Sequence, residues 1–365
     1  MKQTNYHLYD FMDFDEALSR EESLWKAWTP TEVYERHGDI FLTVPFQRQK
    51  RQNDMEAESG MLQECHTLIL RAYRPDVLRL FISMCGDELS DESDILLYAP
   101  EFTPEPLTLQ EEGSLYTIKD ATGRVRAAID TRPPAVDVWS RLLPAPQPSL
   151  GLTLYPDGDR YKPLHVSDDH FSPPRYDGLA LGYCLTEGHE DRATLTFESE
   201  HDECFVGTGE RFRKMDLSGQ TFQMHNQDGQ GVNNRRCYKN VPFYLSSRMY
   251  GVFYHTIDNC KLSLADHSTR SVQFLCDRAT LDVFVIGGGM PERILRTYRI
   301  ITGFPTTPPL WSYGIWMSRM TYFAADEVNE ICDRLRREHY PCDVIHLDTG
   351  WFRTDWLCEW KFNPE

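Results

Sequence analysis

The sequence predicts a mainly β protein, in which a large antiparallel β-sandwich is followed by one parallel strand–helix–strand unit. Short segments rich in β-branched and aromatic residues recur between residues 39 and 286, with turn residues between them and almost no helical periodicity. After residue 286 helical patterns alternate with apolar runs. The predicted organisation is an N-terminal arm over 1–38, the sandwich over 39–286, a helical connector over 287–304 and a second domain over 305–365.

The first domain is expected to consist of short strands joined by tight turns. Acidic runs and weak periodicity before residue 39 indicate a surface arm or a short helix. Hairpin loops are expected at 121–123 and 248–251, and the proline-rich segment 144–174 predicts a long loop or edge excursion. The expected strands cover residues 40–44, 67–73, 77–84, 115–119, 125–129, 194–197, 243–247, 251–256, 272–276 and 281–286.

The second part begins with a predicted helix over 292–301, because Pro291 suits a first helical turn and Gly303 suits its end. Two apolar runs, 311–318 and 343–348, predict buried strands. The helix expected between them places a set of apolar residues on one face, at helical spacing. These residues are Val328, Ile331, Cys332 and Leu335.

Strand, helix and strand in this order predict one parallel unit with a right-handed crossover. One such unit cannot form a domain, and a closed barrel of eight units needs roughly 200 residues. The sequence therefore favours the front part of a longer protein over a unit that leans on the sandwich.

Composition and charge exclude several classes of protein. With 41% hydrophobic and 26% charged residues the chain is globular in composition, and no run approaches the about 18 apolar residues of a membrane helix. A net charge of −18 disfavours nucleic acid and anionic lipid as partners and suits an uncharged ligand such as a sugar. The ten cysteines contain no CxxC pair, and we interpret them as buried residues of a cytoplasmic protein.

Two segments could carry chemistry. In the first, Glu210 and Arg211 follow two closely spaced glycines and could form an ion pair, and Asp228 in a glycine-flanked loop could accept hydrogen bonds from sugar hydroxyls. In the second, Asp348 ends a predicted parallel strand, where α/β enzymes place ligand-binding groups, and tryptophans follow it. The structural alternatives are, in the first segment, a β-bulge with a structural Glu210–Arg211 ion pair and Asp228 as a turn former, and in the second a turn at Asp348 beside core tryptophans.

Other chemistries have weaker support in the sequence. His346 and Asp348 lie on one face of a strand, as two metal ligands could, but no second ligand pair accompanies them. The glycines at 287–289 lack the spacing and the lysine of a phosphate-binding loop, and no GxSxG motif is present. No metal or organic cofactor is predicted.

Six motifs, in this order, resemble glycoside hydrolase family 31, the retaining α-glycosidases that include α-glucosidases and α-xylosidases. They are Gly207-Thr208-Gly209-Glu210-Arg211-Phe212, Asn226-Gln227-Asp228-Gly229, Tyr238-Lys239-Asn240-Val241-Pro242-Phe243-Tyr244, Thr302-Gly303-Phe304-Pro305, Pro309-Leu310-Trp311-Ser312-Tyr313-Gly314-Ile315-Trp316 and the segment 344–351.

The resemblance implies a mutarotase-like sandwich that leads into a (β/α)8 barrel. It also implies that Asp228 and Asp348, from separate modules, grip one sugar ring. Thr349 and Gly350 would tune the preference between xyloside and glucoside. The remaining residues implied for the sugar pocket are Trp316, Met320, Thr321, Tyr322 and Trp351.

The sequence departs from the family in one large respect. Retaining hydrolysis requires two carboxyl groups roughly 5–5.5 Å apart, and in the family both lie on later barrel strands. We therefore expect the 365-residue chain to lack the nucleophile and the general acid/base and to be inactive. Two alternatives stay open: a non-catalytic carbohydrate-binding or interaction protein, and a complete hydrolase that uses Asp228 and Asp348. A homo-oligomer of the intact protein also stays open.

Overall fold

The computed structural model divides into two compact units, Met1–Gly303 and Phe304–Glu365, and each is described by itself. The residues that it describes are 23–48, 63–96, 104–132, 150–159, 162–166, 179–185, 191–227, 236–354, 357 and 359–364. None of the helices in these ranges has the length and apolar character needed to cross a membrane.

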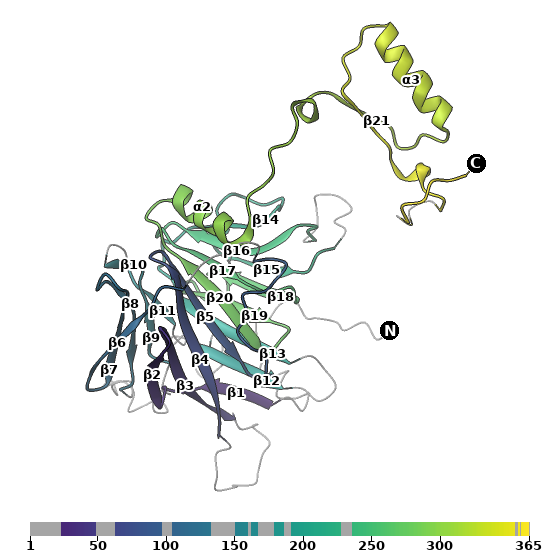
Figure 1. Ribbon diagram of the computed structural model, residues 1–365. Helices are drawn as coiled ribbons and strands as arrows, with labels where there is room; N and C mark the ends of the chain where they lie inside the picture. Colours follow the sequence, from purple (N-terminus) through teal and green to yellow (C-terminus); the bar gives the residue numbers. More distant parts are fainter. Residues whose placement is uncertain are drawn as a thin grey trace. The chain divides into compact units, whose positions relative to one another are not determined.

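The first unit is built almost entirely of β-strands (Figure 1). Every strand pairing in its described part is antiparallel, as predicted. The strands are β1 Ser23–Ala27, β2 Glu32–Arg36, β3 Asp39–Arg48, β4 Gln63–Arg74, β5 Val77–Ser83, β6 Thr108–Glu112, β7 Leu115–Lys119, β8 Val125–Asp130, β9 Leu152–Leu154, β10 Pro156–Asp159, β11 Leu164–Val166, β12 Leu181–Leu185, β13 Arg192–Glu198, β14 Phe205–Gly209, β15 Gln220–Met224, β16 Asn240–Ser246, β17 Gly251–Tyr254, β18 Cys260–Leu264, β19 Ser271–Cys276 and β20 Thr280–Ile286.

The pairings give two layers. One layer runs β2-β3-β4-β5-β20-β17-β16-β14. The other runs β1-β12-β13-β19-β18-β15, and β13 also leads through β11, β9 and β8 to β7 and β6. Pairing of β1 with β3 joins the two layers at one edge. This confirms the predicted mainly β, antiparallel fold class.

Alternation along each strand decides which side chains reach the core between the layers. On β20, Val283 and Val285 belong to this core, whereas Phe284 and Ile286 lie on the opposite face in a second apolar cluster. The helix α2, Pro291–Thr302, supplies residues to that second cluster, so it covers the outer face of the sheet. Gly251 allows this close approach, because a Cβ there would lie 2.8 Å from Ile294 Cγ2.

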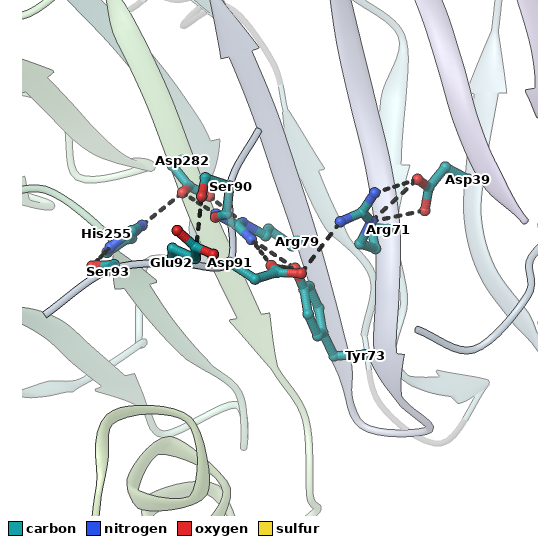
Figure 2. A network of polar contacts seen from close by, with 10 residues as sticks. All are labelled: Asp39, Arg71, Tyr73, Arg79, Ser90, Asp91, Glu92, Ser93, His255 and Asp282. Carbon is teal, nitrogen blue, oxygen red and sulfur yellow. Dashed lines mark hydrogen bonds and ion pairs between the residues drawn. The ribbon is translucent and has the colours of Figure 1, made fainter. Parts of the chain in front are cut away.

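A buried polar network on the outer side of β4, β5 and β20 fixes the segment that follows β5 (Figure 2). Arg79, almost fully buried, donates to Asp282 at 2.6 Å and to Asp91 at 2.7 Å. His255 bridges Asp282 and Ser93, with both contacts at 2.7 Å. Since Asp282 is shared with Arg79, and since Ser93 Oγ also accepts the Ile95 N–H at 3.1 Å, this serine–histidine–aspartate chain ties the segment to the sheet.

The second unit contains the predicted parallel strand–helix–strand arrangement. Strands β21, Trp316–Ser318, and β22, Val344–His346, pair in parallel, and the helix α3, Ala325–Arg337, lies between them in the chain. Two short 3₁₀ helices, η3 Leu310–Tyr313 and η4 Thr349–Trp351, flank the strands. The predicted apolar stripe of α3 is the half-buried face of the helix, which confirms its amphipathic pattern.

Several local predictions are wrong. Residues 23–36 hold strands β1 and β2 where a surface arm or short helix was expected, and the 144–174 segment contains β9, β10 and β11. The run 311–318 divides into η3 and β21, and β21 is exposed because the described part of its sheet has two strands only. Of the nine described cysteines, Cys65, Cys85 and Cys204 are exposed, which corrects the interpretation of all of them as buried.

Candidate functional site

The carboxylate of Asp348 lies just beyond the C-terminal end of β22. Its Oδ1 accepts the backbone N–H of Thr349 at 2.8 Å, and this contact begins η4. The side chain is half-buried, and a carboxylate has about four acceptor positions. One bond to a backbone N–H therefore leaves capacity for the hydroxyl groups of a ligand.

The segments that follow the two parallel strands meet at Gly350 and Thr321. A Cβ at Gly350 would lie 2.5 Å from Thr321 Cγ2 and 2.8 Å from Thr321 Oγ1. Any side chain at position 350 would thus displace Thr321. The structure brings these two predicted site residues together, and Gly350 lies two positions after Asp348 in the chain.

The neighbours of Thr321 lie in different environments. Met320 is 83% exposed, whereas Tyr322 is 4% exposed. The Tyr322 ring lies beneath the Arg319 guanidinium at 5.1 Å, and its hydroxyl has no hydrogen-bond partner among the described residues. Met320 is therefore the more accessible of the two, and the role implied for each in a sugar pocket stays a prediction.

The two tryptophans of the predicted site are held differently. Trp316 on β21 is half-exposed, and its indole N–H donates to the Ser312 carbonyl at 3.0 Å. Trp351 belongs to an aromatic cluster, with its ring 4.1 Å from that of Phe352 and 5.0 Å from that of Phe362. The second arrangement agrees with the structural alternative, in which the tryptophan is a packing residue.

Sequence reasoning missed a clamp at the start of the parallel strands. Asp343 Oδ2 accepts the Ile315 N–H at 3.1 Å, and the Asp343 N–H donates to the Ile315 carbonyl at 2.9 Å. A Cβ at Gly314 would lie 2.0 Å from Asp343 Oδ2. The signal in the sequence was a glycine and an aspartate, each placed just before an apolar run.

In the sandwich unit, the closely spaced glycines form the β-bulge of the structural alternative. The β14–β16 register shifts between Gly207 and Gly209, and Gly207, Thr208 and Gly209 all have positive φ, at 126°, 64° and 92°. A Cβ at Gly209 would lie 1.9 Å from the Lys239 carbonyl oxygen. Glycine is therefore required at position 209 by both the backbone conformation and the close approach.

The predicted ion pair between Glu210 and Arg211 is not formed. Glu210 pairs with Lys239 at 3.1 Å on the surface, whereas Arg211 donates to the Thr208 hydroxyl at 3.2 Å and to the side chain of Asn240. Both residues lie just beyond the end of β14, and each side chain finds a partner on the segment that leads into β16.

These motif residues hold the two ends of the loop that carries Asp228. The amide of Asn240 donates to Asn226 Oδ1 at 2.8 Å, and the Gln227 N–H donates to the Cys237 carbonyl at 3.0 Å. Asp228 itself lies outside the described residues. Its predicted convergence with Asp348 on one sugar stays a prediction.

The metal-site alternative gains no support from the arrangement of His346, whose Nδ1 lies 3.0 Å from Ser318 Oγ across the parallel pair. Among the described residues, one group of side chains has the spacing of metal ligands, and it is the surface turn Glu200-His201-Asp202. Lys162 and Arg248 already pair with its carboxylates.

Two family models match the chain. The N-terminal galactose mutarotase-like domain of glycosyl hydrolase family 31 matches residues 67–262, and the TIM-barrel domain of the same family matches residues 305–365. The chain belongs to glycosyl hydrolase family 31. The resemblance inferred from the motifs, and the sandwich followed by the start of a barrel, are thereby confirmed.

Among curated members of family 31, an α-xylosidase of Lactiplantibacillus pentosus, XylQ, is 34% identical over 166 residues, and an α-xylosidase of Emericella nidulans is 34% identical over 165 residues. Each alignment covers 45% of this chain, and the chain spans only 22% and 21% of the two relatives. An α-glucosidase 2 of Bacillus thermoamyloliquefaciens is 25% identical over 287 residues, or 76% of this chain and 32% of the relative.

Solved structures share the fold. A family 31 dextranase of Flavobacterium johnsoniae in complex with glucose superimposes with a TM-score of 0.64 at 20% identity, over 92% of this chain and 35% of that one. An α-xylosidase from a soil metagenome in complex with xylose gives 0.54 at 18% identity, over 86% of this chain and 41% of that one.

Proposed function

We propose that this chain forms the sandwich and the first strand–helix–strand unit of a retaining α-glycosidase that acts on α-xylosides or α-glucosides. The observation that carries the proposal is the position of Asp348, half-buried at the carboxyl end of a parallel strand beside the Thr321–Gly350 contact. Barrel enzymes bind their substrates at this end of their strands. Membership of family 31 and the two α-xylosidase relatives support the same reaction class.

In this proposal the chain binds the sugar and does not cleave it. Asp348 would accept hydrogen bonds from hydroxyl groups, and Thr349 and Gly350 would limit the space for the group at sugar C5. The nucleophile and the general acid/base, which must lie roughly 5–5.5 Å apart, would come from a part of the protein beyond residue 365. We place the protein in the cytoplasm, because Cys65, Cys85 and Cys204 are exposed free thiols, which are typical of a reducing compartment.

The first test assays the purified 365-residue chain on p-nitrophenyl α-xyloside and α-glucoside, and reads the coding DNA beyond Glu365. We expect no turnover, and an open frame that supplies two further strand-end aspartates. A stop codon together with sugar binding would instead favour the non-catalytic carbohydrate-binding protein. Turnover by the chain that is lost in Asp348→Asn would favour the complete hydrolase.

The second test uses the protein with its catalytic aspartates. Asp348→Asn removes charge-assisted hydrogen bonds to the sugar, which are worth about 1.5–3 kcal/mol, so kcat/KM should fall by roughly 10- to 150-fold. Asp333→Asn on the exposed side of α3 makes the same chemical change away from the strand ends and should leave kcat/KM unchanged. Equal losses in the two variants would contradict a sugar-binding role for Asp348.

In the same protein, Asp228→Ala is expected to weaken catalysis without unfolding the sandwich. If Asp228→Ala lowers the thermal stability of the sandwich together with the activity, the role of Asp228 is structural.

A further inference from the structure

A groove of about 810 Å³ opens on the sandwich unit beside β15 and β18. Gln223 on β15 and Lys261 on β18 stand opposite each other in register and both line it. Phe222, which also belongs to the core cluster, lines it as well. The groove is thus lined by a hydrogen-bonded pair of strands.

The lining of the groove is basic although the chain is strongly acidic. Among the described lining residues there are four permanently cationic side chains and a single carboxylate, in a chain with a net charge of −18. The cations are Arg211, Arg213, Arg236 and Lys261, the carboxylate is Asp266, and His225 and His267 add two titratable rings. A concave surface lined by one sign of charge concentrates ligands of the opposite sign.

The other lining groups are those that bind sugars. Phe212 is 73% exposed at the groove and offers a flat apolar face to the C–H side of a pyranose ring. Three glutamine side chains, Gln220, Gln223 and Gln227, supply amide donors and acceptors suited to hydroxyl groups. A long nucleic acid fits poorly, because the net charge of −18 would repel its remaining phosphates.

We propose that this groove binds an acidic saccharide, that is, a sugar that bears a carboxylate or a phosphate group. Arg213 and Lys261 contact the oxyanion, Gln223 contacts a hydroxyl group, and Phe212 covers the sugar ring. Arg211 contributes charge without contacting the ligand, because its guanidinium is engaged by Thr208 and Asn240 and lies over the Phe222 ring at 4.7 Å. The site goes beyond the proposed glycosidase reaction, and it requires no turnover.

Calorimetric titration of the 365-residue chain with glucuronic acid, glucose 6-phosphate, glucose and inorganic phosphate tests the proposal. We expect at least one of the two acidic sugars to bind, at least tenfold more tightly than glucose and than phosphate, with affinity that falls as NaCl is raised. Binding of glucuronic acid alone identifies a carboxylate ligand, and binding of glucose 6-phosphate alone identifies a phosphate ligand.

Two variants with the same loss of charge localise the binding. Arg213→Gln/Lys261→Gln should lower the affinity at least tenfold. Arg132→Gln/Lys162→Gln removes two exposed cations, each in a surface ion pair elsewhere on the sandwich unit. This control should change the affinity for the acidic sugar by less than twofold. Phe212→Ala should weaken the binding of the acidic sugar and leave the weak binding of phosphate unchanged.

Three results would overturn the proposal. Equal affinity for glucose and both acidic sugars would show that the carboxylate or phosphate group contributes nothing to binding. Phosphate that binds as tightly as the acidic sugar would reduce the groove to a simple anion site. Equal losses in the two double variants would show that net charge, and not this groove, governs binding.

Discussion

The family 31 motifs are packed differently in the two units of the molecule. In the sandwich unit, Gly209 faces a backbone carbonyl, to which an added Cβ would come within 1.9 Å. In the second unit, Gly314 and Gly350 face the side chains of Asp343 and Thr321. The Lys239 carbonyl already accepts the Glu210 N–H and cannot move aside without breaking this bond, whereas the Thr321 side chain can change its rotamer. The motif in the sandwich therefore fixes the residues on either side of Asp228, and the motif in the second unit presents side chains that can adjust.

The largest effect is expected at Gly209. Gly209→Ala combines a φ of 92° with the 1.9 Å approach to the Lys239 oxygen, and should lower the free energy of unfolding of the sandwich by about 3 kcal/mol or more. Gly219→Ala is the matched control, because its φ of 71° is similar and its Cβ would meet nothing within 4 Å. Gly219→Ala should lower the free energy of unfolding by about 1 kcal/mol. Urea denaturation followed by far-UV circular dichroism measures both, and equal losses would show that backbone conformation alone sets the requirement.

A smaller effect is expected at Asn240, which joins Arg211 to Asn226. Asn240→Ala removes the acceptor of the Arg211 guanidinium and the donor to Asn226 Oδ1, and should cost about 2 kcal/mol. Lys239→Ala removes only an exposed ion pair with Glu210 and should cost less than about 1 kcal/mol. If the two variants lose the same free energy in the urea experiment, the loop ends are not held by this network.

The strands that sequence patterns predicted well are rich in β-branched and aromatic residues. Residues 115–119 match β7 at both ends, and 281–286 match β20 within one residue. In two of the missed strands, β14 and β10, glycine or proline interrupts that pattern. β14 contains the bulge glycines, and β10 begins with Pro156 and contains Gly158, so neither resembles a strand before the pairing is known.

The site was predictable in part, for a related reason. Asp348 was found because a carboxylate after an apolar run predicts a strand end, and that depends on local sequence only. The Glu210–Lys239 pair and the Asp343–Ile315 clamp join residues about thirty positions apart, so they depend on the register of the strands. Nothing in the neighbouring residues specifies such contacts, and the structure was required to find them.

The smallest effect is expected at Asp348, and it tests the second half of the comparison. Asp348→Ala removes the acceptor of the Thr349 N–H and should destabilise the second unit by about 1 kcal/mol, whereas Asp348→Asn keeps an oxygen acceptor and should cost less than about 0.5 kcal/mol. Near-UV circular dichroism of the Trp351 cluster during thermal unfolding reports on this unit. If Asp348→Asn destabilises the unit as much as Asp348→Ala, the negative charge itself is structural. The carboxylate would then stabilise the fold and would not be available to a ligand. The two units would no longer differ in whether their motifs hold the backbone or present side chains to a ligand.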